Sequence, residues 1–379
     1  MVLCGADRIA EYEKKLKGKR VGLLTNQSGQ DSKGTSTIHL LMKSCELTAL
    51  FGPEHGVSGK GDAGQHLEDG VDPETGLPVY SLYGEHRHFT EEMLAAFDVL
   101  VYDIQDVGAR FYTYISTLHN ALTDCARAGK QVLVLDRPNP LGGRTVEGGL
   151  LKEGYESFVG CYPLPIRYGL TAGELALMMN EEQKIGCDLE IAVCQGWRRD
   201  SLFPDWGWEW HAPSVALTSF ESALLYPGTC LFEGVNLSEG RGTEAPFRII
   251  GADYVDGEQL CHAFEKCHLP GVKAEPVHFT PTCSKYEGIA CQGLRLHVTD
   301  VDAIRPVTIG VVLLDLVRTL YAGSYALRPP HREGGKPGLA LLSGGQVLLG
   351  NWDCKEVLAA YQEECRAFLE RKARFHLYA

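Results

Sequence analysis

Polar clusters follow four short apolar runs in the first part of the chain, at the points where strands of a sheet would end. They occupy residues 25–27 (TNQ), 52–56 (GPEHG), 103–110 (DIQDVGAR) and 136–140 (DRPNP). The carboxyl ends of parallel strands lie along one edge of an open sheet, where ligands bind. The sequence therefore predicts a polar site built from four segments that lie far apart along the chain.

Glu54 is the strongest candidate for acid–base chemistry in these clusters. It follows an apolar run and is flanked by Pro53 and by the pair His55-Gly56. A carboxyl group at the end of a buried strand is partly desolvated, which favours its protonated form and suits a general acid. A helix cap, or an ion pair with Lys60 in the following loop, is the alternative interpretation.

Two aspartates, Asp103 and Asp106, bracket Gln105, and either could serve as a second carboxylate. Asp106 could equally cap a helix that is expected to begin near Arg110. The helix dipole mildly disfavours a cation at a helix start, so Arg110 indicates an anionic ligand or a buried partner. Pairing between Arg110 and Asp106 is the competing explanation.

The segment 233–246 (EGVNLSEGRGTEAP) is polar, rich in glycine and outside any periodic pattern. Loops of this kind often carry functional side chains because a rigid scaffold displays them. The segment would lie near a domain junction, a frequent place for a pocket. A flexible, solvated linker is the alternative. The candidate site residues in this segment are Glu239, Arg241, Thr243 and Glu244.

Several histidines raise the question of a metal site. The candidates are His55, His66, His86 and His88. No carboxylate–histidine spacing among them is diagnostic, and histidine in a solvated loop is the commoner case, so no metal is expected. No GxGxxG follows the first expected strand and no P-loop pattern occurs, so no nucleotide cofactor is expected either.

A cluster of four tryptophans lies at positions 197, 206, 208 and 210. Aromatic faces stack well on sugar rings, but core packing explains tryptophans more often. The cluster alone therefore does not decide between a sugar-binding surface and part of the core.

Short apolar runs alternate with helical patterns in the first half of the chain, which is typical of βαβ units and a parallel sheet. Strands are expected at 20–27, 47–54, 98–106, 131–137 and 189–195. Helices are expected at 35–44, 91–97, 110–129 and 171–183, the last opened by a Thr171–Glu174 capping box. Residues 55–90 read as one long loop. The fold class is therefore α/β, with a second, smaller α+β domain from about residue 250 that ends in a helix at 355–372.

Composition limits the class of protein and its partners. The formal net charge of −13 disfavours binding to nucleic acid phosphates, and no apolar run has the length of a membrane-spanning helix. The 13 cysteines are scattered without a C-x-x-C pair, which favours free thiols in a reducing compartment. Residues 1–19 do not resemble a secretory signal, so a cytoplasmic location is expected, with export as the alternative if a signal was removed.

Long motifs carry a resemblance to a known family. They include TNQSG at 25–29, GPEHG at 52–56, TGLPVYSLYG at 75–84 and YDIQDVGARFYTYISTLHNAL at 102–122. Further motifs are LDRPNPLGG at 135–143, YPGT at 226–229 and NLSEGRGTEAPF at 236–247. The similarity extends over nearly the whole chain, and the sequence resembles the family of exo-acting β-N-acetylmuramidases.

This resemblance implies a Rossmann-like catalytic domain at 1–245 that holds no dinucleotide, and a smaller α+β domain at 246–379 that completes the cleft. It implies release of terminal N-acetylmuramic acid from the non-reducing ends of peptidoglycan fragments, with Glu54 as the leading catalytic residue. Residues 213–218 (PSVALT) depart from the family's Pro-Ser-Pro-Asn-x-Pro pattern. That departure leaves the local sugar contacts and the preferred substrate open.

The mechanism expected from the resemblance is hydrolysis of a β-1,4 linkage, with Glu54 protonating the leaving oxygen. The second group would be Asp103, Asp106, Glu244 or the acetamido oxygen of the substrate itself. A separation of about 5 Å between two carboxyl groups favours retention, and about 6.5–9.5 Å favours inversion. A metal-dependent hydrolase that uses the same edge, and a non-catalytic sugar-binding protein, are the alternative functions.

The expected substrate is a peptidoglycan-derived saccharide, and its lactyl carboxylate calls for an arginine, either Arg110 or Arg241. The side chains expected to bind hydroxyl or acetamide groups are Asn26, His55, Gln105 and Asn139. The remaining substrate-binding candidates are Tyr112, Glu239 and Thr243. The sequence gives no indication of protein partners.

Overall fold

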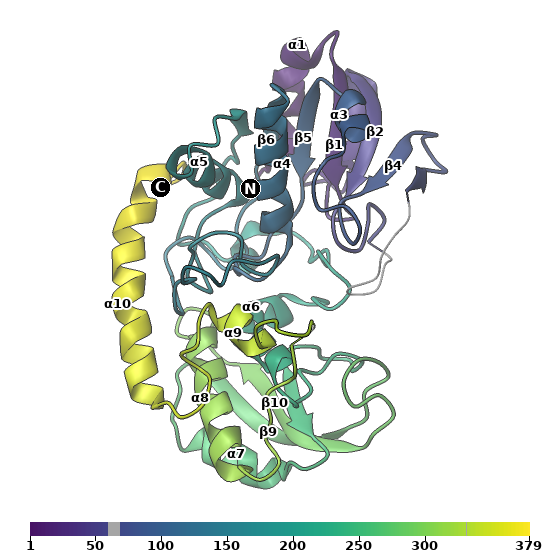
Figure 1. Cartoon of the computed structure of the whole chain (residues 1–379). Coiled ribbons are helices and arrows are strands. Elements are labelled where there is room, and N and C mark those ends of the chain that lie inside the picture. The colour runs from purple at the N-terminus through teal and green to yellow at the C-terminus, as the bar shows by residue number, and fades with distance from the viewer. Residues whose placement is uncertain (60–68, 331) are drawn as a thin grey trace.

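A computed structural model describes residues 1–59, 69–330 and 332–379 of the chain. The chain forms two units, each built on its own sheet, which lie one above the other in Figure 1. The first unit holds a seven-stranded, mostly parallel sheet and the second a three-stranded antiparallel sheet. The predicted α/β class with a second, smaller sheet domain is therefore confirmed.

The seven-stranded sheet has the order β3-β4-β2-β1-β5-β6-β7, and only the β3–β4 pair is antiparallel. Its strands are β1 (Arg20–Thr25), β2 (Glu46–Gly52), β3 (Gly70–Val71), β4 (Pro78–Ser81), β5 (Val99–Asp103), β6 (Gln131–Leu135) and β7 (Asp188–Ala192). The central strands read as continuous apolar runs because both faces of a parallel sheet are covered. In β5, Val99 and Val101 join one hydrophobic cluster while Leu100 and Tyr102 join the other.

Helices cover both faces of this sheet. One face packs against α3 (Glu91–Ala95), α4 (Tyr114–Arg127) and α5 (Ala172–Glu182). The other packs against η1 (Gly5–Tyr12), α1 (Glu13–Leu16) and α2 (Thr37–Ser44). The predicted capping box of α5 is confirmed, since Glu174 N donates to Thr171 Oγ1 at 3.2 Å and Thr171 N donates to Glu174 Oε2 at 3.1 Å.

The structure corrects two sequence predictions in the first unit. The helix expected from Arg110 begins only at Tyr114, because a turn intervenes in which Asp106 accepts a bond from Gly108 N at 2.7 Å. Gly108 has a φ of +70°, which favours glycine over any other residue there. The long loop expected at 55–90 contains β3 and β4, and β4 pairs in parallel with β2.

The second unit is built on β8 (Ile249–Ala252), β9 (Val272–Phe279) and β10 (Cys291–Val298), in the order β8-β10-β9. Its helices are α6 (Phe220–Thr229), η3 (Cys230–Gly234), α7 (Gly257–Glu265), α8 (Pro306–Leu320) and α9 (Gly338–Ser343). Helix α6 packs so closely on α8 that a Cβ at Gly228 would lie 1.8 Å from the Pro306 carbonyl oxygen. Helix α6 therefore belongs with the second unit.

The C-terminal helix α10 (Cys354–Lys372) leaves the second unit and returns to the first, as Figure 1 shows. At its end, Lys372 Nζ donates to the carbonyl oxygens of Gly143 at 2.6 Å and Gly169 at 2.7 Å. Tyr378, in the segment after the short turn η4 (Ala373–Phe375), donates to Asp136. The chain thus ties its two units together at a second place, far from the segment where it first crosses.

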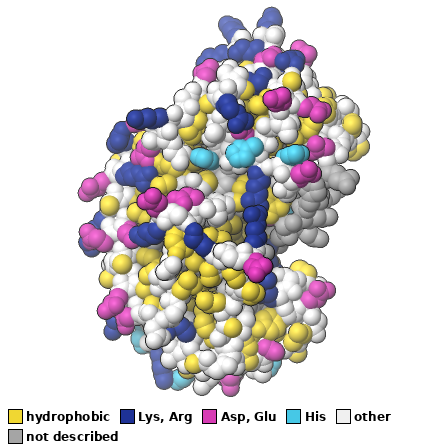
Figure 2. All heavy atoms as spheres, in the orientation of Figure 1, with side chains coloured by type: hydrophobic (Ala, Val, Ile, Leu, Met, Phe, Trp, Pro, Cys, Tyr) yellow, Lys and Arg dark blue, Asp and Glu magenta, His cyan; other side chains and the backbone are white. Residues whose placement is uncertain are grey.

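Acidic and basic side chains are interspersed on the face of the molecule shown in Figure 2. In the described parts of the chain, no helix combines the length and the apolar character needed to cross a membrane.

Candidate functional site

Two hollows open at the carboxyl edge of the large sheet. The Glu54 pocket has a volume of about 50 Å³ and is lined by Glu54, His55, Phe111, Tyr112, Thr113, Tyr114, Ser214, Ala216, Leu217, Tyr226, Arg241 and Phe247. The Arg137 crevice, of about 360 Å³, is lined by Ser28, Gln30, Asp31, Ser32, Lys33, Gly34, Gln105, Arg137, Pro140, Phe203, Trp206, Gly207, Trp208, Glu209, Trp210 and His211. The pocket combines residues of both units, whereas the crevice belongs to the first unit alone.

A tight turn after β2 presents Glu54 to its pocket. Gly56 N donates to the Pro53 carbonyl oxygen at 2.9 Å, and His55 and Gly56 both have a φ of +72°. The left-handed conformation costs a residue other than glycine about 1–2 kcal/mol, so the rest of the turn must hold His55 in place. Gly52 permits the fold-back, since a Cβ there would lie 2.8 Å from Val57 N. The GPEHG spacing is therefore a requirement of the backbone as well as of the chemistry.

Hydroxyl groups surround the half-buried carboxylate of Glu54. Thr113 donates its hydroxyl to Glu54 Oε2 at 2.7 Å, although Thr113 stands at the N-cap position of α4. Burial, together with the charge of Glu54 and a hydrogen bond to it, raises the pKa of Tyr83 to about 12. Tyr83 thus remains a neutral donor toward Glu54.

A pair of tyrosines forms the wall of the pocket on the first unit. The rings of Tyr112 and Tyr114 lie 4.7 Å apart at 68°, and the Tyr114 hydroxyl donates to the Pro213 carbonyl oxygen at 2.8 Å. Burial raises the pKa of both phenols, and the charges of Glu54 and Asp106 raise that of Tyr114 further. Both hydroxyls are therefore neutral at pH 7, and the proton of the Tyr114 hydroxyl is already used in the bond to Pro213.

The second unit supplies Arg241 to the opposite wall. Arg241 Nη2 donates to Glu233 Oε1 at 2.8 Å, its Nε lies 3.3 Å from Glu239 Oε1, and its guanidinium stacks 5.0 Å from the ring of Phe247. Burial lowers the pKa of Arg241, but the charges of Glu233 and Glu239 outweigh it and the net shift is upward. Among the lining residues of the pocket, Arg241 is the one arginine or lysine.

The segment 233–246 is an ordered wall, which corrects its alternative interpretation as a flexible linker. Glu239 is 1% exposed and also pairs with Lys285 at 2.8 Å. Phe247, which follows the segment, has a φ of +63°, and its N–H donates to the Glu239 carbonyl oxygen at 2.6 Å. Two residues in left-handed conformation, His55 and Phe247, thus line the same small pocket. Such conformations concentrate at functional sites.

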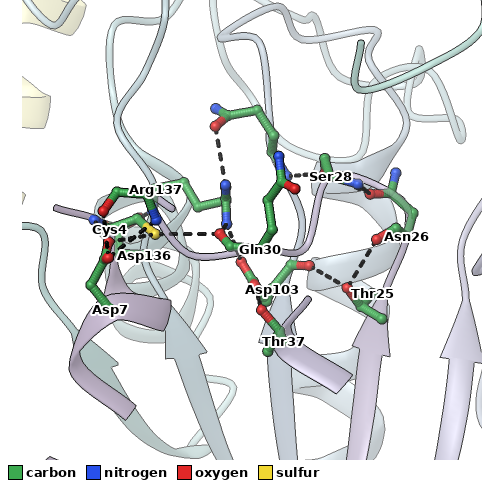
Figure 3. A network of polar contacts seen from close by, with 12 residues as sticks. Cys4, Asp7, Thr25, Asn26, Ser28, Gln30, Thr37, Asp103, Asp136 and Arg137 are labelled. Carbon is green, nitrogen blue, oxygen red and sulfur yellow. Dashed lines mark hydrogen bonds and ion pairs between the residues drawn. The ribbon is translucent and has the colours of Figure 1, made fainter. Parts of the chain in front are cut away.

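Asp103, one predicted second carboxylate, lies beneath the Arg137 crevice. It is completely buried, forms an ion pair with Arg137 Nη1 at 2.8 Å and accepts a bond from Thr37 (Figure 3). Burial raises the pKa of Asp103, although the charge of Arg137 opposes the rise. Because its carboxylate is enclosed and neutralised, we leave Asp103 out of the candidate catalytic set.

Asp106 is buried behind the tyrosine pair. Its Oδ2 accepts bonds from Gly108 N and from the Tyr168 hydroxyl, so it does not cap α4 as the sequence suggested. Burial raises the pKa of Asp106 to about 6 even though these bonds lower it. Asp106 lines neither hollow, and a direct attack on a substrate from this position is therefore not open to it.

The structure also corrects the expectations for Arg110 and Glu244. Arg110 is completely buried and donates to the carbonyl oxygens of Gly149, Leu164 and Leu342 at 2.6–2.7 Å. It therefore joins the first unit to α9 and clamps no anion, and it does not pair with Asp106. Glu244 points to solvent and pairs with Arg295 outside the pocket, so it is not placed to act on a substrate there.

Several side chains that were predicted to bind the sugar form hydrogen bonds within the protein instead. Asn139 donates to the Leu170 carbonyl oxygen at 2.9 Å and accepts from Leu141 N at 2.9 Å, and Asn26 joins Pro213 to Ser28 in the same way. Thr243 donates to the Gly240 carbonyl oxygen. Gln105 faces the Arg137 crevice. Of the predicted residues, Glu54, His55, Tyr112 and Arg241 meet in the Glu54 pocket.

Among the described residues, no group of three or more His, Cys, Asp or Glu side chains is placed to hold a metal ion. His66 and Lys60, which the sequence analysis singled out, lie outside the described residues. His88 Nδ1 lies 3.1 Å from Asp124 Oδ2, in a pair away from both hollows.

Sequence reasoning missed several residues that shape the pocket. The most important are Thr113, which holds Glu54, and Tyr83, Tyr226 and Phe247. Thr113 lies within the FYTY stretch of a recognised motif, but it fell inside a helix that was predicted to begin too early. The other three come from distant parts of the chain, and only the folded structure brings them together.

Comparison with known proteins gives the class to which this fold and site belong. Two family models match, "Exo-beta-N-acetylmuramidase NamZ, N-terminal" over residues 21–221 and "Exo-beta-N-acetylmuramidase NamZ, C-terminal" over residues 224–378. The chain therefore belongs to the exo-β-N-acetylmuramidase NamZ family.

Individual relatives agree with this assignment. The chain is 44% identical, over 315 residues, to the peptidoglycan beta-N-acetylmuramidase NamZ of Bacillus subtilis strain 168, covering 83% of this chain and 76% of that protein. A crystal structure of a DUF1343 family protein from Bacteroides fragilis NCTC 9343 superposes with a TM-score of 0.90 at 35% identity, covering 100% of this chain and 99% of that one. A second DUF1343 protein from the same organism gives a TM-score of 0.78 at 28% identity with the same coverage.

Proposed function

We propose that this chain is an exo-acting glycosidase that releases N-acetylmuramic acid from the non-reducing ends of peptidoglycan fragments, with Glu54 as the general acid. Family membership supports the reaction and the substrate class. The observation that carries the role of Glu54 is its half-buried carboxyl group, held by the Thr113 hydroxyl inside a pocket shared by both units. That position puts the carboxyl group at the wall of the pocket that a sugar would enter.

In the proposed first step, Glu54 transfers its proton to the glycosidic oxygen while the bond from this oxygen to the anomeric carbon breaks. No second carboxyl group is found among the described residues that line the pocket. We therefore assign attack on the anomeric carbon to the acetamido oxygen of the substrate, a known variant among glycosidases. In the second step, ionised Glu54 removes a proton from water as the water oxygen attacks the same carbon, and the bond from this carbon to the acetamido oxygen breaks, which restores the acetamide. The product keeps the β configuration.

The other residues of the pocket would recognise the muramic acid. Arg241 supports recognition of the lactyl carboxylate, because a guanidinium forms strong, directional bonds to a carboxylate. Its bonds to Glu233 use Nε and Nη2, and no bond of Nη1 is found within the described residues. His55 and Tyr112 lie in the same pocket and supply groups for the acetamide and the hydroxyls.

We propose further that the protein works in a reducing compartment such as the cytoplasm. All 13 cysteines are free thiols, and eight of them are buried. Cys4 and Cys194 belong to the interior of the first unit. Free thiols persist where the redox environment keeps them reduced.

Replacement of Glu54 by glutamine tests the proposed acid. Glutamine keeps an oxygen that can accept the Thr113 hydroxyl, so the turn should survive, but it has no acidic proton. We expect the hydrolysis rate of a muramic acid–glucosamine disaccharide to fall by about 10²–10⁴-fold, the usual contribution of general acid–base catalysis. Glu244→Gln is the matched control and should keep the parent rate. A Glu54→Gln protein that hydrolyses the disaccharide at the parent rate would overturn the assignment.

A further inference from the structure

The Arg137 crevice occupies the position where open α/β sheets usually bind ligands. Strand β1 has β2 on one side and β5 on the other, so the chain reverses its direction of winding between β1 and β5. Ser28 and Gln30 follow β1, Gln105 follows β5 and Arg137 follows β6, and all four line the crevice. The crevice is therefore at the topological switch point of the sheet. Glu54 lies to one side of it, beyond β2.

A buried guanidinium forms the floor of the crevice. The Arg137 side chain is 5% exposed, its Nη1 donates to Asp103 Oδ1 at 2.8 Å and to the Gln30 carbonyl oxygen at 2.9 Å, and its Nε donates to Gln105 Oε1 at 3.2 Å. Figure 3 shows this network. Within the described residues, Nη2 forms no hydrogen bond, and this atom is not fully enclosed by the protein. Arg137 thus offers one fixed donor to whatever fills the crevice.

No surplus of positive charge faces the crevice. Asp103 neutralises Arg137 from below, and at the rim Lys33 is accompanied by two acidic residues, Asp31 and Glu209. A phosphate or carboxylate would therefore not be attracted here. This distribution of charge favours a neutral ligand that carries hydrogen-bond acceptors for the guanidinium.

Aromatic rings form one wall. Trp206 and Trp208 lie 5.4 Å apart at 78°, and Trp210 contacts Phe203 at 4.8 Å. The indole nitrogens of Trp208 and Trp210 donate to the carbonyl oxygens of Val2 and Leu217 at 3.1 and 2.9 Å, which fixes both rings. Fixed aromatic rings that line the same crevice as a guanidinium donor suit a sugar ring, which presents C–H groups on its faces and oxygens at its rim.

One short segment separates the crevice from the Glu54 pocket. His211 lines the crevice and Ser214 lines the pocket. Their Cα atoms are at most about 11 Å apart, because consecutive Cα atoms are 3.8 Å apart. Asn26 Nδ2 and Gln27 Nε2 donate to the Pro213 carbonyl oxygen at 3.2 and 2.9 Å and hold this segment against the end of β1. A saccharide of two or three residues is long enough to reach both hollows.

We propose that the Arg137 crevice binds the uncharged N-acetylglucosamine portion of the substrate, on the leaving-group side of the bond that is cleaved. This inference rests on the proposed function, because it assumes that the muramic acid occupies the Glu54 pocket. It makes the tryptophan cluster a specificity determinant for a saccharide leaving group. An enzyme with this crevice prefers a sugar leaving group to a simple aryl group.

The test compares two substrates that differ only beyond the cleaved bond, a muramic acid–N-acetylglucosamine disaccharide and a 4-nitrophenyl muramic acid glycoside. Trp208→Ala and Trp210→Ala are made singly, with Lys43→Ala on the outer surface of α2 as the control. We expect each tryptophan variant to lower the ratio of kcat/KM for the disaccharide to that for the aryl glycoside by about tenfold, a reasonable loss for one stacking ring. Partial unfolding would lower both values together and leave the ratio unchanged.

A binding measurement keeps the inference testable if a variant folds poorly. N-acetylglucosamine disaccharide, titrated into the parent protein, should change tryptophan fluorescence in a saturable way and inhibit hydrolysis of natural disaccharide. An unchanged ratio in both variants, or no saturable binding, would overturn the crevice as a sugar site. A parent protein that hydrolyses neither substrate would instead overturn the proposed function.

Discussion

The Glu54 pocket and the Arg137 crevice lie at the same edge of one sheet, yet their carboxylates have opposite surroundings. Asp103 is fully enclosed and paired with a guanidinium, whereas Glu54 is half-buried and held by the hydroxyl group of Thr113. Both follow or end an apolar strand, so the sequence pattern treats them alike. Depth of burial and the charge of the partner therefore separate a carboxylate that is enclosed in the fold from one that lines a pocket, as the proposed role of Glu54 requires.

The largest expected effect that separates the two regions is on stability. Asp103→Ala leaves the buried Arg137 without its counter-charge, and breaking a buried ion pair in this way costs about 3–5 kcal/mol. Urea unfolding followed by tryptophan fluorescence measures the loss. Glu244→Ala removes the exposed pair with Arg295 and should change stability by less than about 1 kcal/mol. Equal losses in both variants would contradict the contrast between enclosed and exposed carboxylates.

The next largest effect is the contribution of Asp106 to the pH dependence of stability. Burial raises its pKa to about 6, above the value of about 3.9 expected in the unfolded chain, so between about pH 4 and 6 the folded state binds more protons. Asp106 therefore makes stability fall as pH rises through this window, by up to about 3 kcal/mol. Asp106→Asn should remove that part of the fall, because an amide does not titrate. The fold should survive, because the amide oxygen can still accept hydrogen bonds from Gly108 and Tyr168.

Unfolding free energies measured from pH 4 to 7 test this expectation. Asp136 is also buried, and its pKa is likewise raised to about 6, so part of the slope should persist in the variant. An Asp106→Asn protein with the full slope of the parent would show that Asp106 is ionised in the folded state throughout this range.

Much of the fold follows from sequence pattern, and the physical reason is local. The apolar run of β5 and the Thr171–Glu174 box depend on residues close together in the chain, and the strand and the box are both confirmed. Strand β4 was missed because four residues cannot establish a period and because its pairing with β2 is long-range. The start of α4 was predicted too early because the apolar residues at 111 and 114–115 are all buried in the core, although residue 111 precedes the helix.

The site was predictable only in part. Sequence placed the polar clusters at one edge but gave no depth, so Asp103 and Arg110 read as ligand-binding groups although both are enclosed. The sequence also does not show which side chains bond to one another, so it could not predict that the edge is divided into a pocket and a crevice. Glu54 was predictable because the Gly52 and Gly56 positions mark a tight turn whatever the surrounding fold.

A matched pair of threonines gives a smaller effect that sharpens the comparison. Thr113 donates to Glu54 and Thr37 donates to Asp103. Thr113→Val should lower kcat by about tenfold with little change in stability, since the lost bond holds a reacting group. Thr37→Val should lower stability by about 1–3 kcal/mol, the usual value for a bond to a buried charged group, and leave kcat near that of the parent. If Thr37→Val lowered kcat and Thr113→Val lowered stability, the roles assigned to the two regions would be wrong.

The smallest expected effect is that of a chelator. Proton transfer by Glu54 and attack by the substrate's acetamido group together supply both halves of the proposed reaction. We therefore expect dialysis against EDTA to leave the rate on the disaccharide unchanged. Loss of activity that returns with an added divalent cation would favour the metal-dependent alternative.

The most direct test of Glu54 as the acid compares leaving groups in the Glu54→Gln protein. A sugar leaving group needs a proton, whereas 4-nitrophenolate leaves with little help. We expect the variant to lose about 10²–10⁴-fold in kcat on the disaccharide and clearly less on the 4-nitrophenyl glycoside. Equal losses on the two substrates would contradict the claim that Glu54 protonates the departing oxygen.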